Sequence, residues 1–190
     1  MNARHVFWSL VGIVGLVALS GCIPSLNSVY TDDDLVFDEA VVGEWTAAEG
    51  ESNWVFTKQG EKAYRLVYTE EDGKQGVFAA HLAKVDGVRF LDLYPEDLPG
   101  DTAGFYRAHQ VPIHTVYLVR SVEPSLELVA IDLGWLGKHL AEHPEAIEHA
   151  GQENRILITA PTKELQQFLL KNLDRFTGEI TLERVQPPTS

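Results

Sequence analysis

Residues 63–94 read AYRLVYTEEDGKQGVFAAHLAKVDGVRFLDLY, and this stretch decides the fold. Links containing Gly73 and Gly87 divide it into three segments rich in β-branched and aromatic side chains. The pair Asp86-Gly87 suits a two-residue type I′ turn, which joins antiparallel strands. The stretch therefore predicts three consecutive antiparallel strands.

Further strands are predicted on both sides of this stretch. They lie at Trp45, 54–57, 113–122, 126–131, 155–159 and 179–184. Tyr64, Leu66 and Tyr68 alternate with Arg65 and Val67, as in a strand with one buried face. A sheet of about eight or nine strands is expected to curl or close so that its edges are removed. The expected fold is mainly β, an antiparallel meander closing into a barrel or half-barrel, with a β-sandwich as the alternative.

Two accessory helices are predicted near 132–142 and 161–173. Asp132 can cap the first helix, which carries Leu133, Leu136 and Leu140 and stops at Pro144. Pro161 stands near the start of the second, and Leu165, Phe168, Leu169 and Leu173 form its apolar stripe. Both helices are expected to dock on the sheet.

Gly43-Glu44-Trp45 at the start of the first strand resembles the G-x-W signature of lipocalins and other calycins. Thr115-Val116-Tyr117 is similar to their second motif. The resemblance implies a lipocalin-like barrel. The sequence departs from the family in predicting two helices after the seventh strand, where lipocalins have a single late helix.

Composition limits the classes of function. The chain has 190 residues and a net charge of −13, and it shows no basic run with interleaved aromatic residues. Because nucleic acids are bound by clustered Lys and Arg, nucleic acid is excluded as an expected partner. The single cysteine cannot form an internal disulfide. The length after a leader suits one domain, predicted over 39–190.

Residues 1–21 are predicted to be a signal peptide. Arg4 precedes an apolar run from Val6 to Leu19, which is too short as a helix to cross a bilayer core of roughly 30 Å. Leu19-Ser20-Gly21-Cys22 resembles the lipobox of bacterial lipoproteins. The resemblance implies lipidation of the Cys22 thiol, cleavage before Cys22 and acylation, for instance with palmitate, of the new terminus. An ordinary signal peptide with a chance cysteine is the alternative.

The residues after Cys22 suggest a location and a tether. By resemblance to lipoprotein sorting, Ile23 implies the periplasmic face of the outer membrane in a Gram-negative host. In a Gram-positive host the domain would lie on the outer face of the cytoplasmic membrane. Residues 22–38 contain the run Asp32-Asp33-Asp34 and little periodicity, and we expect a solvated tether, with cation binding by the acidic run as the alternative.

A candidate ligand site lies around the long link from Pro95 to Pro112. Long loops in compact domains are often functional, and this one would be a lid over a barrel. The candidate site residues are Arg107, His109, His114, Tyr117 and His81. Arg107 would meet an anionic head group, and His81, on one face with Ala79 and Ala83, would line a cavity. The alternative is a solvated loop with histidines packed in ordinary surroundings.

His139-Leu140-Ala141-Glu142-His143 resembles the H-x-x-E-H signature of inverted zinc proteases. The resemblance implies His139 and His143 as zinc ligands and Glu142 as base. Pro144 disfavours helical geometry at His143, so we interpret the segment as an exposed helix end whose histidines complement the helix dipole. No G-x-S-x-G or phosphate-binding glycine loop occurs, and neither an enzyme nor a cofactor is predicted.

Three functions follow as hypotheses. The first is a lipid-anchored envelope protein that binds a small apolar or amphipathic ligand. It predicts a large cavity, and an interior filled by Trp45, Phe56, Tyr64 and Phe90 would contradict it. The second is an envelope lipoprotein with a structural or protein-interaction role, and the third is a zinc hydrolase.

Overall fold

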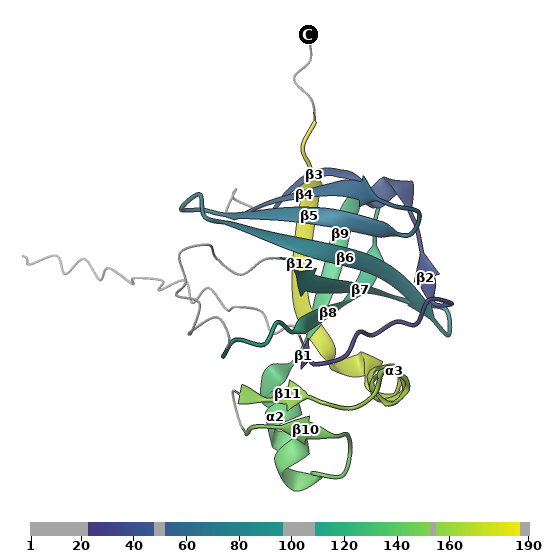
Figure 1. Ribbon diagram of the computed structural model, residues 1–190, viewed down its shortest axis with the longest axis vertical. Coiled ribbons are helices and arrows are strands. Elements are labelled where there is room, and N and C mark those ends of the chain that lie inside the picture. Colours follow the sequence, from purple (N-terminus) through teal and green to yellow (C-terminus); the bar gives the residue numbers. More distant parts are fainter. Residues whose placement is uncertain (1–22, 48–51, 97–108, 153–154, 187–190) are drawn as a thin grey trace, which may run out of the picture.

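The body of the protein is a closed, eight-stranded antiparallel β-barrel (Figure 1). The computed structural model describes residues 23–47, 52–96, 109–152 and 155–186. The barrel strands are β3 (Gly43–Ala47), β4 (Ser52–Gln59), β5 (Ala63–Glu70), β6 (Gln75–Val85), β7 (Val88–Pro95), β8 (His114–Ser121), β9 (Ser125–Ile131) and β12 (Phe176–Arg184). Each strand pairs with the next along the chain, and β12 closes the barrel between β9 and β3. The predicted lipocalin-like meander is confirmed.

The hairpin between β6 and β7 has the predicted turn. Val85 pairs with Val88, and Asp86 and Gly87 have φ values of 47° and 87°. Both central residues of a type I′ turn require positive φ, which Gly adopts freely and Asp tolerates. Local turn chemistry therefore sets the register of this pair of strands.

The barrel interior is filled by side chains from all eight strands. Trp45, Phe56 and Tyr64 are at most 1% exposed. The remaining interior residues from the strands are Trp54, Leu66, Ala80, Leu82, Leu91, Leu93, Tyr117, Val119, Leu126, Leu128, Ala130 and Leu182. The short helix η1 (Glu39–Val41) packs against this core, and the Tyr64 hydroxyl donates to the Asp38 carbonyl at 3.0 Å. The interior is thus a packed core.

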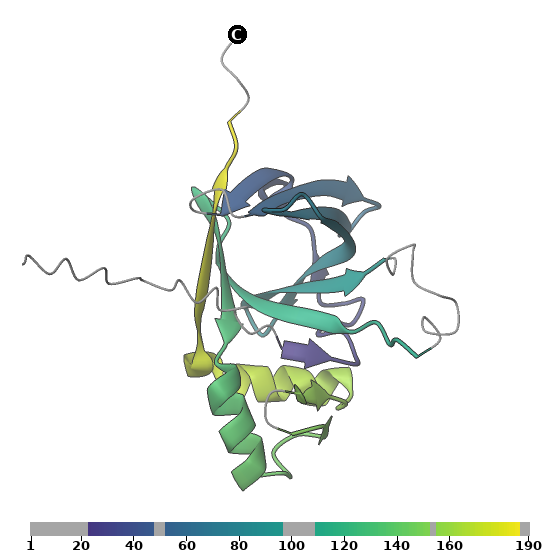
Figure 2. The ribbon, with the colours of Figure 1, turned by 90° about the vertical axis from the view of Figure 1, so that its left-hand side faces the viewer.

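Phe90 belongs to a second core on the outer face of the barrel. Its strand neighbours Leu91 and Leu93 point inward, so the pleat directs Phe90 outward. There it packs in a cluster with buried residues of α2 (Leu133–Glu142) and α3 (Thr162–Lys171), which lie below the barrel (Figure 2). Of the four aromatic residues whose presence inside the barrel would contradict a ligand cavity, Trp45, Phe56 and Tyr64 lie in the interior and Phe90 does not. Strand periodicity alone does not say which face a closed barrel turns inward.

Both helices form where they are predicted. The Asp132 carboxylate caps α2 by accepting the Trp135 N–H at 2.9 Å, and α2 ends at Glu142, two residues before Pro144. In α3 the apolar stripe buries Leu165, Phe168 and Leu169. Among the described residues, no helix has both the length and the apolar character that crossing a membrane requires.

The predicted strand at 155–159 is wrong in length and place. Only β11 (Leu157–Ile158) forms there, and it lies outside the barrel between β10 (His149–Ala150) and β1 (Ile23–Ser25). β8 already pairs with β9 over its second half, and its first half pairs with β1. A small side sheet, β8-β1-β11-β10, therefore branches from the barrel.

The segment expected to be a solvated tether is packed against the barrel. Ile23, Ser25 and Val29 are fully buried, and β2 (Leu35–Val36) pairs with β6. The Asp34 carboxylate accepts the Thr31 N–H and hydroxyl at 2.8 and 2.7 Å. These bonds lower the pKa of Asp34 against the opposing effect of burial, which is the larger single influence. Long-range contacts, which leave no periodicity in sequence, order residues 23–36.

Candidate functional site

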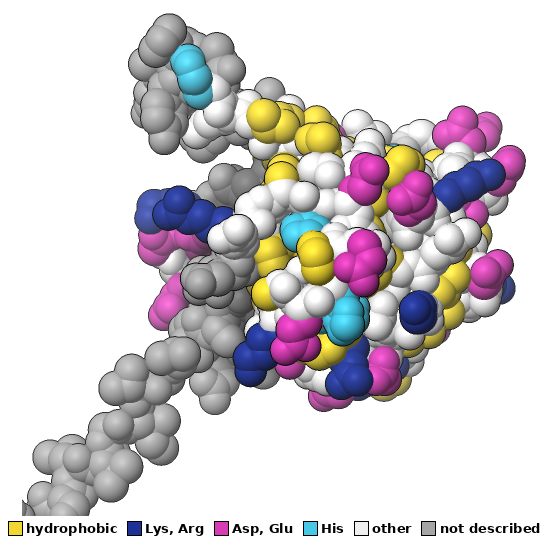
Figure 3. All heavy atoms as spheres, turned by 90° about the horizontal axis from the view of Figure 1, so that it is seen from below, with side chains coloured by type: hydrophobic (Ala, Val, Ile, Leu, Met, Phe, Trp, Pro, Cys, Tyr) yellow, Lys and Arg dark blue, Asp and Glu magenta, His cyan; other side chains and the backbone are white. Residues whose placement is uncertain are grey.

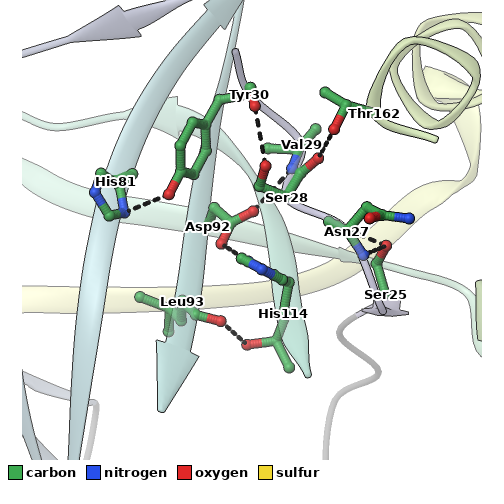
Figure 4. A network of polar contacts seen from close by, with 11 residues as sticks. Ser25, Asn27, Ser28, Val29, Tyr30, His81, Asp92, Leu93, His114 and Thr162 are labelled. Carbon is green, nitrogen blue, oxygen red and sulfur yellow. Dashed lines mark hydrogen bonds and ion pairs between the residues drawn. The ribbon is translucent and has the colours of Figure 1, made fainter. Parts of the chain in front are cut away.

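A buried polar network lies on the outer face of the barrel, beneath the N-terminal segment (Figure 4). At its centre is Asp92 of β7, whose side chain is fully buried. One Asp92 carboxylate oxygen accepts the Val29 N–H at 2.9 Å, and the other lies 2.7 Å from His114 Nδ1. Both contacts stabilise the carboxylate, whose burial without hydrogen-bonding partners would cost several kcal/mol.

Three neighbouring strands place the network on one face. His81 of β6 pairs directly with Asp92, and Asp92 pairs with Val116 of β8. His114 stands two residues before Val116 and so shares its face. The pleat of the sheet thus brings together two histidines and one carboxylate that are far apart in sequence.

Tyr30 completes the network from the N-terminal segment. Its hydroxyl lies 3.0 Å from His81 Nδ1, and the two rings are 4.6 Å apart. Burial raises the pKa of Tyr30 to about 12, and the carboxylates of Asp92 and Asp32 act in the same direction. The hydroxyl therefore keeps its proton, and the tautomer of His81 decides whether it donates or accepts the hydrogen bond.

His81 is held in its neutral form. Burial lowers the pKa of His81, and repulsion from His114 adds to this effect, whereas the Asp92 carboxylate opposes it. A neutral imidazole with Nδ1 as acceptor matches the hydroxyl of Tyr30. This contact couples the ionisation state of His81 to the docking of the N-terminal segment.

A serine hydrolase triad consists of Asp, His and Ser, and the same residue types occur here. Asp92 contacts His114, and Ser25 pairs with His114 across β1 and β8. The Ser25 hydroxyl, however, donates to the Asn27 carbonyl at 2.7 Å, and Ser25 is fully buried. A nucleophile must bond to its base and reach a substrate. The geometry therefore fits a structural role, in which these residues hold the N-terminal segment against the barrel, better than it fits catalysis.

The residues predicted as a ligand site separate into different places. His81 and His114 meet in the network, outside the barrel rather than in its cavity as expected for His81. Tyr117 points into the barrel core, and His109 is exposed. Arg107 lies outside the described residues. The prediction missed Tyr30 and the role of Asp92, although the alternation of Phe90 and Asp92 with leucines marks a shared face.

The residues of the H-x-x-E-H segment do not converge on a metal site. His139 stacks on Trp135 with ring centroids 4.8 Å apart, and His143 Nδ1 lies 3.8 Å from a Glu145 carboxylate oxygen. Over the described ranges, no group of three or more His, Cys, Asp or Glu side chains is arranged to hold a metal ion. The zinc-hydrolase hypothesis gains no support from this geometry.

A half-open groove of about 480 Å³ lies beside this segment. It is lined by His139, Glu145, Ala146, Ile147, Glu148, Glu164, Gln167, Phe168, Lys171 and Asn172. Figure 3 shows the lower face of the molecule, where hydrophobic, acidic, basic and histidine side chains are intermixed. The lining of the groove thus combines apolar side chains and His139 with three glutamates and one lysine.

Comparison with known proteins found no match among protein-family models, curated protein sequences or solved structures.

Proposed function

We propose that this chain is a lipid-anchored protein of the bacterial cell envelope whose barrel acts as an interaction or structural module. The lipid anchor is inferred from the lipobox-like sequence Leu19-Ser20-Gly21-Cys22, which stands at the end of a short apolar run. Several acyl chains would hold the protein firmly, since each buried CH₂ contributes roughly 0.8 kcal/mol. By resemblance, Ile23 favours the periplasmic face of the outer membrane.

The anchor is tested by the mass of the mature N-terminal peptide. Cleavage before Cys22 with added diacylglyceryl and acyl groups is expected for the native chain. Cys22→Ser removes the thiol and should leave an unlipidated precursor that keeps residues 1–21. Ser20→Ala preserves a small residue and should be processed normally. An unmodified Cys22 in the mature native protein would overturn the proposed anchor.

The packed interior supports an interaction module over a ligand carrier. An eight-stranded barrel can hold one small ligand if its interior is left open. Here Trp45, Phe56 and Tyr64 are buried in the core inside the barrel, and the rings of Phe56 and Tyr64 meet edge-to-face with centroids 6.4 Å apart. A partner would therefore contact the outer surface, and the partner proposed is another envelope protein.

A carrier of a small apolar or amphipathic ligand is the second candidate, and the closed barrel architecture is what favours it. Native mass spectrometry of the protein, extracted from its own host in mild detergent, separates the two. The interaction module predicts a complex with a second polypeptide. A stoichiometric small-molecule mass on the lone chain would instead establish the carrier.

A further inference from the structure

Ile23, the residue directly after the proposed lipid anchor, already belongs to the folded sheet. Ile23 is fully buried and pairs with Val116, and Pro24 and Ser25 pair with the two preceding residues of β8, Thr115 and His114. Ser25 also pairs with Ile158 of β11. No linker of even a few residues separates Cys22 from this sheet.

Several independent contacts hold the segment from Leu26 to Ser28, which follows β1. The Leu26 N–H donates to the Ile158 carbonyl at 2.8 Å, and the Asn27 side-chain amide donates to the Ala160 carbonyl at 3.0 Å. The Thr162 hydroxyl donates to the Ser28 carbonyl at 2.9 Å. Figure 4 shows Asn27, Ser28 and Thr162 beside the network of Asp92. Detaching β1 would expose its apolar side chains and leave buried polar groups without partners, which is costly.

We infer that this domain is held directly against the lipid bilayer, without a spacer, by the edge at which β1 and β11 begin. This inference rests on the proposed lipidation of Cys22. One residue spans at most about 3.6 Å, so Ile23 must stay within a few ångströms of the lipidated residue. The bilayer that receives the acyl chains is therefore also the surface that this edge of the protein meets.

The orientation follows from the parallel pairing of β1 and β11. Parallel strands begin at the same edge, and the described residues of the β10–β11 turn, Gly151, Gln152, Arg155 and Ile156, lie at that edge. Arg155 in this turn is exposed and suits contact with phospholipid phosphates. The strand registers place the turn between β5 and β6 at the end of the barrel toward which β1 runs, away from the edge at which β1 begins. In Figure 1 this turn lies well above β1.

Quenching by membrane nitroxides tests this arrangement. Cys22 is the only native cysteine and is consumed by lipidation, so an introduced cysteine can be labelled uniquely. Gln152→Cys places a fluorophore at the anchored edge, and Glu71→Cys places one in the β5–β6 turn; both positions are exposed. The lipidated full-length mature protein is reconstituted in phosphatidylethanolamine and phosphatidylglycerol vesicles containing head-group nitroxide lipids.

Strong quenching is expected at position 152 and little at position 71. An eight-residue Gly-Ser insert between Cys22 and Ile23 adds a flexible span of roughly 15 Å and should abolish most quenching at position 152. Equal quenching at the two positions, or quenching at 152 that the insert leaves unchanged, would overturn the inference. Absence of lipid on Cys22 by mass spectrometry would instead refute the proposed function on which the inference rests.

Discussion

At the scale of single residues, Asp92 connects two parts of the chain that lie 63 positions apart. Asp92→Ala leaves the Val29 N–H and the His114 ring without their acceptor, and we expect a loss of about 3 kcal/mol in the free energy of unfolding. Chemical denaturation measures it. Asp72→Ala, at an exposed turn, is the matched control and should change stability by less than about 0.5 kcal/mol. If Asp92→Ala lowers the free energy of unfolding no more than this control does, the carboxylate does not hold the N-terminal segment against the barrel.

His81 gives a prediction about pH. Its pKa is lowered in the folded state, so the unfolded chain takes up a proton first as the pH falls. The contribution of His81 to stability is therefore complete above its ordinary pKa of about 6.5 and declines as the pH falls toward the folded value. His81→Gln keeps an acceptor for Tyr30 but does not titrate. Chemical denaturation is measured from about pH 8 to about pH 5. The free energy of unfolding should decline less in the variant than in the native protein, and an equal decline would contradict this assignment.

At the scale of elements, α2 depends on its cap. Asp132→Ala removes the acceptor of the Trp135 N–H, and the expected cost is about 1 kcal/mol in the free energy of unfolding. Thermal or chemical denaturation measures this change. Asp174→Ala, an exposed acidic residue of η4 (Leu173–Arg175), serves as control and should be nearly neutral. Equal effects of the two substitutions would mean that the cap does not stabilise the helix.

At the scale of the whole molecule, the distinction between the two cores can be tested. Phe56→Ala removes a ring from the barrel interior and should cost about 3–5 kcal/mol while opening a cavity that admits benzene. Thermal shift with and without benzene measures both effects. Phe90→Ala is a matched loss of a ring from the outer core. The native protein should show no benzene-dependent shift, and a shift as large as that of Phe56→Ala would favour the ligand carrier.

The sequence was sufficient where structure is decided locally. Strand alternation, the Asp86-Gly87 turn and the Asp132 cap depend on neighbours a few residues apart, and the meander and both helices followed from them. The candidate site was only partly predictable. His81 and His114 were named from sequence, but Asp92 had no visible partner and Tyr30 was missed, because their contacts join distant strands.

The strand pattern was readable from the sequence alone, since a pleat is a local pattern. The resemblance of Leu19–Cys22 to a lipobox is local too, and the anchor that it implies stays a prediction. Only the tertiary structure decided which strand face turns inward, and so placed Phe56 inside the barrel and His81 outside it. It also ordered residues 23–36 against the barrel in place of the expected tether. The physical reason is the same in both cases: burial and hydrogen bonding across long sequence separations exist only once the barrel has closed.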